Sequence, residues 1–115
     1  MSTLKVNDII EATSGGGKVF QCRVYCNYNQ SGTISVTESG NVSSIVDEST
    51  GIATISFSNS LANANYSAPA TSQAGQMRIG DTAEMLSSAI LFVVENDGGS
   101  NQDKPINTFV VVGTG

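Results

Sequence analysis

Few side chains in this 115-residue sequence are of types that catalyse reactions. The chain has no His, two Cys, and 10 Asp and Glu against 5 Lys and Arg. Catalytic arrangements that need an imidazole, and metal sites with His ligands, are therefore excluded. The remaining candidates for chemistry are the two cysteines, a glycine-lysine segment, an acidic pair and one oxygen-rich loop.

The cysteines, Cys22 and Cys26, lie four residues apart in a run that alternates like a β-strand. On a strand both thiols point to one face, about 13 Å apart at roughly 3.3 Å per residue, whereas a disulfide needs its Cα atoms within ~7 Å. Two cysteines without further ligands do not complete a zinc shell. We expect free thiols that flank Val24 on the core face.

The other candidates also lack the pattern that their chemistry needs. Lys18 follows three glycines, but Val19 stands where a phosphate-binding loop has Ser or Thr. Asp47 and Glu48 are adjacent, so on a strand they point to opposite faces and cannot act as a paired acid and base. The loop 97–103 lacks the ligand alternation of an EF-hand, so we expect a polar loop, with an ion site as the alternative. The sequence predicts no cofactor and no enzymatic activity.

Charge and hydropathy exclude two classes of partner. The net charge of −5 has the wrong sign for a surface that follows phosphates, so no nucleic-acid partner is expected. The longest apolar runs, 91–94 and 109–112, are far shorter than the ~20 residues of a membrane helix. The N-terminus lacks the basic and apolar regions of a secretory signal, so we expect synthesis in the cytoplasm and no membrane partner.

The elements that position these residues are predicted to be strands. Ser, Thr, Asn, Gly and Val dominate the composition, and they suit strands and turns more than helices. Turn-forming residues divide the chain into short segments at a spacing typical of a sandwich or barrel. We predict an all-β fold, an antiparallel β-sandwich or jelly-roll-like domain. Its expected strands are 19–28, 33–38, 42–47, 51–59, 66–71, 75–79, 89–95 and 107–112.

An extended arm precedes this body in the sequence. Gly15, Gly16 and Gly17 form its most flexible stretch, which divides the chain into an N-terminal arm and glycine hinge, residues 1–18, and a body, residues 19–115. The arm carries apolar residues that gain nothing from remaining in water. We predict that it adds a strand to a partner subunit or particle surface through Leu4, Val6, Ile9 and Ile10.

The faces of several strands follow from alternation. Ile34 and Val36, like Ala53, Ile55 and Phe57, alternate with polar residues and are expected to face the core. The segments 89–94 and 109–112 are apolar on both faces. They are either central strands or strands whose second face is covered by another subunit. We favour the second interpretation, which predicts a subunit interface at Leu91, Val93, Phe109 and Val111.

The run 32–67 resembles a module of virion proteins of tailed phages, notably those of marine and cyanobacterial hosts. The resemblance is carried by Gly-Asn-Val-Ser-Ser-Ile at 40–45, Asp-x-x-x-Gly at 47–51, Thr-x-x-Phe at 54–57 and a corner that ends in Asn65-Tyr66. The arm residues 2–9 and the strand 24–28 are similar to further parts of such proteins. Leu61-Ala62 departs from the module, which has Met-Pro there.

The resemblance implies a non-enzymatic structural protein on the virion surface. Proteins of this kind are often trimeric, and the short chain favours a capsid decoration, cement or short head-fibre protein that binds capsid or tail proteins through its arm. The alternative is a tail-fibre or receptor-binding module that recognises a host-surface glycan or protein through loops such as 97–103.

Overall fold

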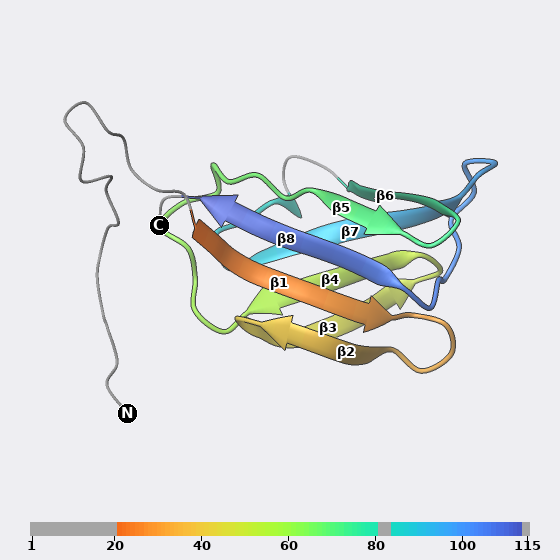
Figure 1. The fold of residues 1–115 in the computed structure, drawn as a ribbon, viewed down its shortest axis with the longest axis horizontal. Coiled ribbons are helices and arrows are strands. Elements are labelled where there is room, and N and C mark those ends of the chain that lie inside the picture. The colour runs from red at the N-terminus through yellow and green to blue at the C-terminus, as the bar shows by residue number, and fades with distance from the viewer. Residues whose placement is uncertain (1–20, 81–83, 114–115) are drawn as a thin grey trace.

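The computed structural model describes residues 21–80 and 84–113. These residues form two four-stranded antiparallel sheets, which confirms the predicted all-β sandwich (Figure 1). The predicted arm residues Leu4, Val6, Ile9 and Ile10 lie outside the described residues. The strands are β1 (Gln21–Asn29), β2 (Ser35–Gly40), β3 (Val42–Ser49), β4 (Ile52–Phe57), β5 (Ala70–Ser72), β6 (Gly75–Ile79), β7 (Ala89–Asn96) and β8 (Asn107–Gly113).

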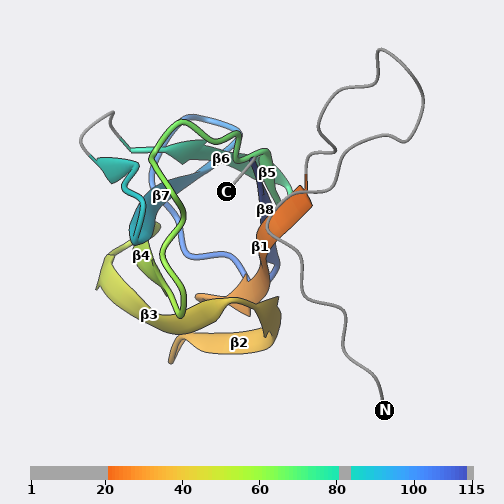
Figure 2. The same cartoon turned by 90° about the vertical axis from the view of Figure 1, so that its left-hand side faces the viewer.

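The two sheets face each other and are joined at both edges. One sheet has the order β2-β1-β8-β5 and the other β3-β4-β7-β6. The short β2–β3 and β5–β6 connections pass from sheet to sheet along the edges, so the body looks like a flattened barrel from its end (Figure 2). The longer connections 58–69 and 97–106 join β4 to β5 and β7 to β8. They cross between the sheets at opposite ends of the sandwich.

The core lies between the sheets and consists of alternate residues of the central strands. Phe92 and Phe109 come from different sheets, and their ring centroids are 4.7 Å apart. The inward positions of β4 confirm the alternation expected from the sequence. The main core residues are Val24, Cys26 and Tyr28 of β1, Ala53, Ile55 and Phe57 of β4, Ile90, Phe92 and Val94 of β7, and Phe109 and Val111 of β8.

One of the two cysteine placements expected from the sequence is wrong. Cys26 is buried beside Val24, but Cys22 is exposed. The pairing of β1 with β8 shifts register between Cys22 and Val24, and this irregularity breaks the alternation of faces. Both thiols are free, as the sequence predicts.

The edge strand β2 buries less than its alternation suggests. Ile34, which precedes it, packs against the core, whereas Val36 is 44% exposed. The outer edge of β2 has no strand paired to it among the described residues, because β1 is its only ladder partner there. Val36 therefore has core neighbours on one side only.

The segments 89–94 and 109–112, apolar on both faces, form the central strands β7 and β8, each with a paired strand along both edges. One face of each strand lies in the core, whereas Leu91 and Val110 are half-buried on the outer faces. Phe109 and Val111 point into the core and are 3% and 0% exposed. These two side chains are therefore not on an outer face, which corrects their placement at a subunit surface.

The segment 40–45 contains the corner between β2 and β3. Asn41 adopts a left-handed φ of 61° at the β2–β3 corner. Its Nδ2 donates to the Asn59 carbonyl at 3.0 Å, and its Oδ1 accepts from the Asn59 amide at 2.7 Å. This side chain ties the start of the 58–69 connection to the corner, since Asn tolerates this backbone region.

The corner 61–66 is anchored by its two ends. Leu61 and Tyr66 are 8% and 7% exposed, and the Tyr66 ring packs edge-on to Phe57 with centroids 6.2 Å apart. The Tyr66 hydroxyl donates to the Leu86 carbonyl at 2.7 Å. Burial raises the pKa of Tyr66 to about 12. The corner is therefore pinned to the connection between β6 and β7.

Polar side chains close the opposite end of the sandwich. Gln30 and Asn107 are both fully buried. Gln30 Nε2 donates to Asp47 Oδ1 at 3.1 Å and to two backbone carbonyls at the β3–β4 connection. Asn107 Nδ2 donates to two further carbonyls, and its Oδ1 accepts from Ser72 Oγ at 2.7 Å. These bonds satisfy both polar atoms of the Asn107 side chain and the Nε2 atom of Gln30, whereas Gln30 Oε1 is buried without a hydrogen-bond partner among the described residues.

Candidate functional site

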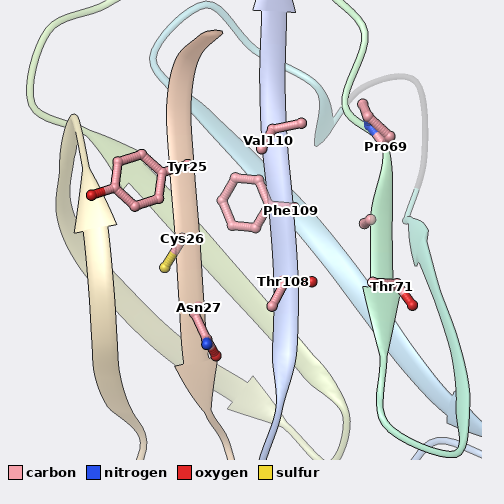
Figure 3. A pocket seen from close by; sticks show the side chains of 9 residues that line it. Tyr25, Cys26, Asn27, Pro69, Thr71, Thr108, Phe109 and Val110 are labelled. Atoms are coloured by element: carbon pink, nitrogen blue, oxygen red, sulfur yellow. The ribbon is translucent and has the colours of Figure 1, made fainter.

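A shallow groove lies on the outer face of the β2-β1-β8-β5 sheet. It has a volume of about 420 Å³ and runs over β1, β8 and the start of β5. In Figure 3 the Tyr25 ring lies at one side of the groove, Pro69 and Thr71 at the other, and Val110 and Thr108 between them. We call this site the Tyr25 groove. Its full lining is Tyr25, Cys26, Asn27, Pro69, Ala70, Thr71, Thr108, Phe109 and Val110.

The cross-strand register brings the lining residues together. Tyr25 is paired with Val110 and Asn27 with Thr108, so an apolar pair and a polar pair lie side by side. Thr108 is also the register partner of Thr71 on β5. Because outward residues alternate along each strand, these side chains share one face of the sheet. The result is an apolar floor with a polar end.

The Tyr25 ring lies over β2 because Gly40 has no side chain that would displace it. The two residues are register partners, and a Cβ on Gly40 would lie within 2.8 Å of Tyr25 Cδ1. The ring can therefore lie against the backbone of the edge strand, as aromatic residues do opposite glycine. Tyr25 remains 42% exposed.

The sequence did not single out this groove. Tyr25 alternates with the core residues Val24 and Cys26, and that pattern was sufficient to place it on an outer face. The proximity of Val110 and Pro69 depends on β1 and β5 both pairing with β8, which local periodicity does not encode.

The second outer face, on the β3-β4-β7-β6 sheet, contains the remaining predicted interface residues. Leu91 and Val93 point outward from β7, and Leu91 is half-buried while Val93 is 6% exposed. Val46 and Leu86 are each 49% exposed. We call these four residues the Leu91 face.

The Val93 side chain is covered by neighbouring residues of its own sheet. Ile52 and Arg78 are its register partners on β4 and β6. The Arg78 Nε atom lies 3.1 Å from Glu95 Oε1, and because the Arg78 side chain is 53% exposed this ion pair adds little stability. Contacts with a subunit would therefore involve Leu91, Val46 and Leu86 more than Val93.

A smaller depression adjoins Leu91. Its volume is about 190 Å³, and Leu86 and Leu91 are among its lining residues. The strand residue Thr54, a register partner of both Leu91 and Val46, also lines it. Glu84 lines the depression as well, so the Leu91 face is slightly hollow and combines apolar side chains with two polar ones, a shape that can accept side chains from another molecule.

The oxygen-rich loop 97–103 uses its polar groups to hold its own shape. Asn96 Oδ1 accepts from two backbone amides of the loop, at 2.9 and 3.1 Å. Asp103 Oδ1 accepts from the Gly51 amide at 2.7 Å, which ties the loop to the β3–β4 turn. Among residues 21–80 and 84–113, no group of three or more His, Cys, Asp or Glu could hold a metal ion. These contacts favour the polar-loop interpretation.

Comparisons with protein-family models, curated proteins and solved structures find no match. Within the part of the chain that the structure describes, no helix is both long enough and apolar enough to span a membrane.

Proposed function

We propose that this chain is a non-enzymatic structural protein of a tailed-phage virion. Its role is that of a trimeric capsid-decoration, cement or short head-fibre protein anchored through the N-terminal arm. The resemblance of residues 32–67 to a virion module carries this proposal. The fold supports it because the matched residues Asn41 and Tyr66 have architectural roles, at the β2–β3 corner and at the end of the 58–69 connection.

The Leu91 face supports the assembly part of the proposal. Exposed apolar residues that form a continuous surface on a small domain are typical of protein contact sites. Val46, Leu86 and Leu91 provide apolar side chains on this face, with Thr54 between Val46 and Leu91 in the register and Glu84 beside Leu91. In the proposed trimer this face packs against the neighbouring subunit.

Sedimentation equilibrium of the purified protein tests the trimer. We expect the mass of three chains at micromolar concentration, and Leu91→Asp should shift the mass toward one chain. Thr37→Asp is the matched control, because Thr37 is exposed on the edge strand β2. A clean monomer for the unmodified protein would overturn the trimer.

Co-purification with virions tests whether the arm anchors the chain to the particle. A variant without residues 1–14 should fail to co-purify with virions and should keep the circular dichroism of a β protein. Attachment at the level of the full chain would overturn the anchoring role.

A further inference from the structure

The Tyr25 groove provides an apolar surface on β1, the strand that follows the arm in the sequence. We propose that this groove seats the apolar part of the chain's own N-terminal arm before the arm engages the particle. This inference rests on the anchoring role proposed above, because it states where the arm is held in the free protein. It assigns the groove an occupant of defined sequence, residues 4–10.

The surface of the groove fits an extended apolar segment. Its volume of about 420 Å³ is within the range of about 300–1,000 Å³ for pockets that bury whole small ligands. Tyr25, Val110 and Pro69 provide its apolar surface. Leu4 and Val6 are two residues apart, so in an extended segment they share one face while Lys5 points away. The same face carries Asp8 further along, so the apolar match is confined to Leu4 and Val6, whose surfaces leave water when they meet the groove.

The arm is long enough to reach the groove of its own chain. β1 starts at Gln21, and Tyr25 lies four residues further along, at roughly 13 Å. The ten residues between Ile10 and Gln21 span at most about 36 Å when extended. The glycines at 15–17 allow this linker to reverse direction, because glycine accepts backbone conformations of both hands.

The same tether favours the chain's own arm over that of a second copy. A short flexible linker gives an effective concentration in the millimolar range. Purified protein at micromolar concentration offers far fewer arms from other molecules.

Disulfide trapping in the full chain tests whether the arm lies in the Tyr25 groove. The exposed Cys22 is first changed to Ser, while Cys26 stays because it is buried. Val6→Cys is then combined with Thr108→Cys in the groove, and under mild oxidation we expect an intrachain disulfide. Val6→Cys with Thr54→Cys is the matched control, because Thr54 is an equally half-buried threonine on the outer face of the other sheet.

We expect the groove disulfide to form about tenfold or more faster than the control disulfide, because the two pairs share one tether and only binding in the groove holds Val6 beside Thr108. Changing Val110 to Asp, or Tyr25 to Ser, should reduce this rate toward the control, with circular dichroism confirming that each variant is folded. Equal rates for the two pairs would overturn the proposal. It is also overturned if a mixture of Val6→Cys and Thr108→Cys single variants forms interchain dimers faster than the double variant closes.

The trapping result is independent of the anchoring result. If trapping fails while the 1–14 deletion abolishes attachment, the arm does not bind the groove but does anchor the chain to the particle. If trapping succeeds while the deletion attaches normally, the groove holds the arm and the anchoring role is wrong.

Discussion

Replacement of Tyr66 by Phe removes one oxygen atom from the corner that joins β4 to β5. The hydroxyl donates to the Leu86 carbonyl at 2.7 Å, and the Ala89 carbonyl lies 3.4 Å away. The ring keeps its volume and its edge-on contact with Phe57. The substitution therefore tests the hydrogen bond that pins the 58–69 connection to the β6–β7 connection, with little change in core packing.

The expected loss in the free energy of unfolding is that of a single neutral hydrogen bond. Such bonds contribute about 0.5–1.5 kcal/mol net, and because Leu86 is half-exposed, water can replace the lost donor at its carbonyl. We expect Tyr66→Phe to lower the free energy of unfolding by about 1 kcal/mol. In urea this equals a midpoint decrease of about 0.3–1 M, given slopes of about 1–3 kcal/mol/M. Tyr66→Ala also loses the ring and should cost about 3–5 kcal/mol.

Urea denaturation followed by circular dichroism measures this loss. Tyr25→Phe is the control, since Tyr25 is 42% exposed in the Tyr25 groove and its variant should stay within about 0.5 kcal/mol of the original protein. The reasoning is refuted if Tyr66→Phe is as stable as the original protein, or if Tyr25→Phe loses as much stability.

Three further predictions concern turns, thiols and alkaline pH. Gly51→Ala should lower the free energy of unfolding by at least about 2 kcal/mol in the same assay, because φ is 73° and a Cβ would meet backbone atoms of two other segments. Gly32 has a φ of 77° with open space around it, so Gly32→Ala should cost only the strain of the left-handed backbone, about 1–2 kcal/mol. A maleimide should modify Cys22 in the native protein and Cys26 only after denaturation, as mass spectrometry would show, because burial shields Cys26 and raises its pKa to about 11. Stability should fall as pH rises above about 9, because Cys26 and Tyr66 have pKa values raised by burial and ionise more readily in the unfolded chain; a denaturation midpoint that stays constant from pH 8 to 11 would contradict this.

Local periodicity was sufficient to predict most of the fold. The positions of Ala53, Ile55 and Phe57 follow from the two-residue period that every strand has, and β6 has the expected bounds. These features depend on neighbours in the sequence.

The features that the sequence missed depend on long-range pairing. The exposure of Cys22 follows from an irregular register with β8, whose residues lie about ninety positions later in the chain. Phe109 and Val111 are covered because they point into the core, where the opposite sheet packs on them, and apolar composition on both faces of 109–112 does not reveal which face that is. The Tyr25 groove has the same origin, since Gly40 and Val110 reach Tyr25 only through strand pairing. Pattern analysis placed each side chain on a face and could not identify its neighbours.

The location of the chain on purified particles tests the proposed virion role most directly. Antibodies against the body, with gold labels, would be applied to tailed-phage particles from the source of this sequence after density-gradient purification. The proposal predicts that the chain stays with the particles and that the label lies on their surface, at the capsid or tail. Particles without label, with all of the chain in the unbound fraction, would contradict it.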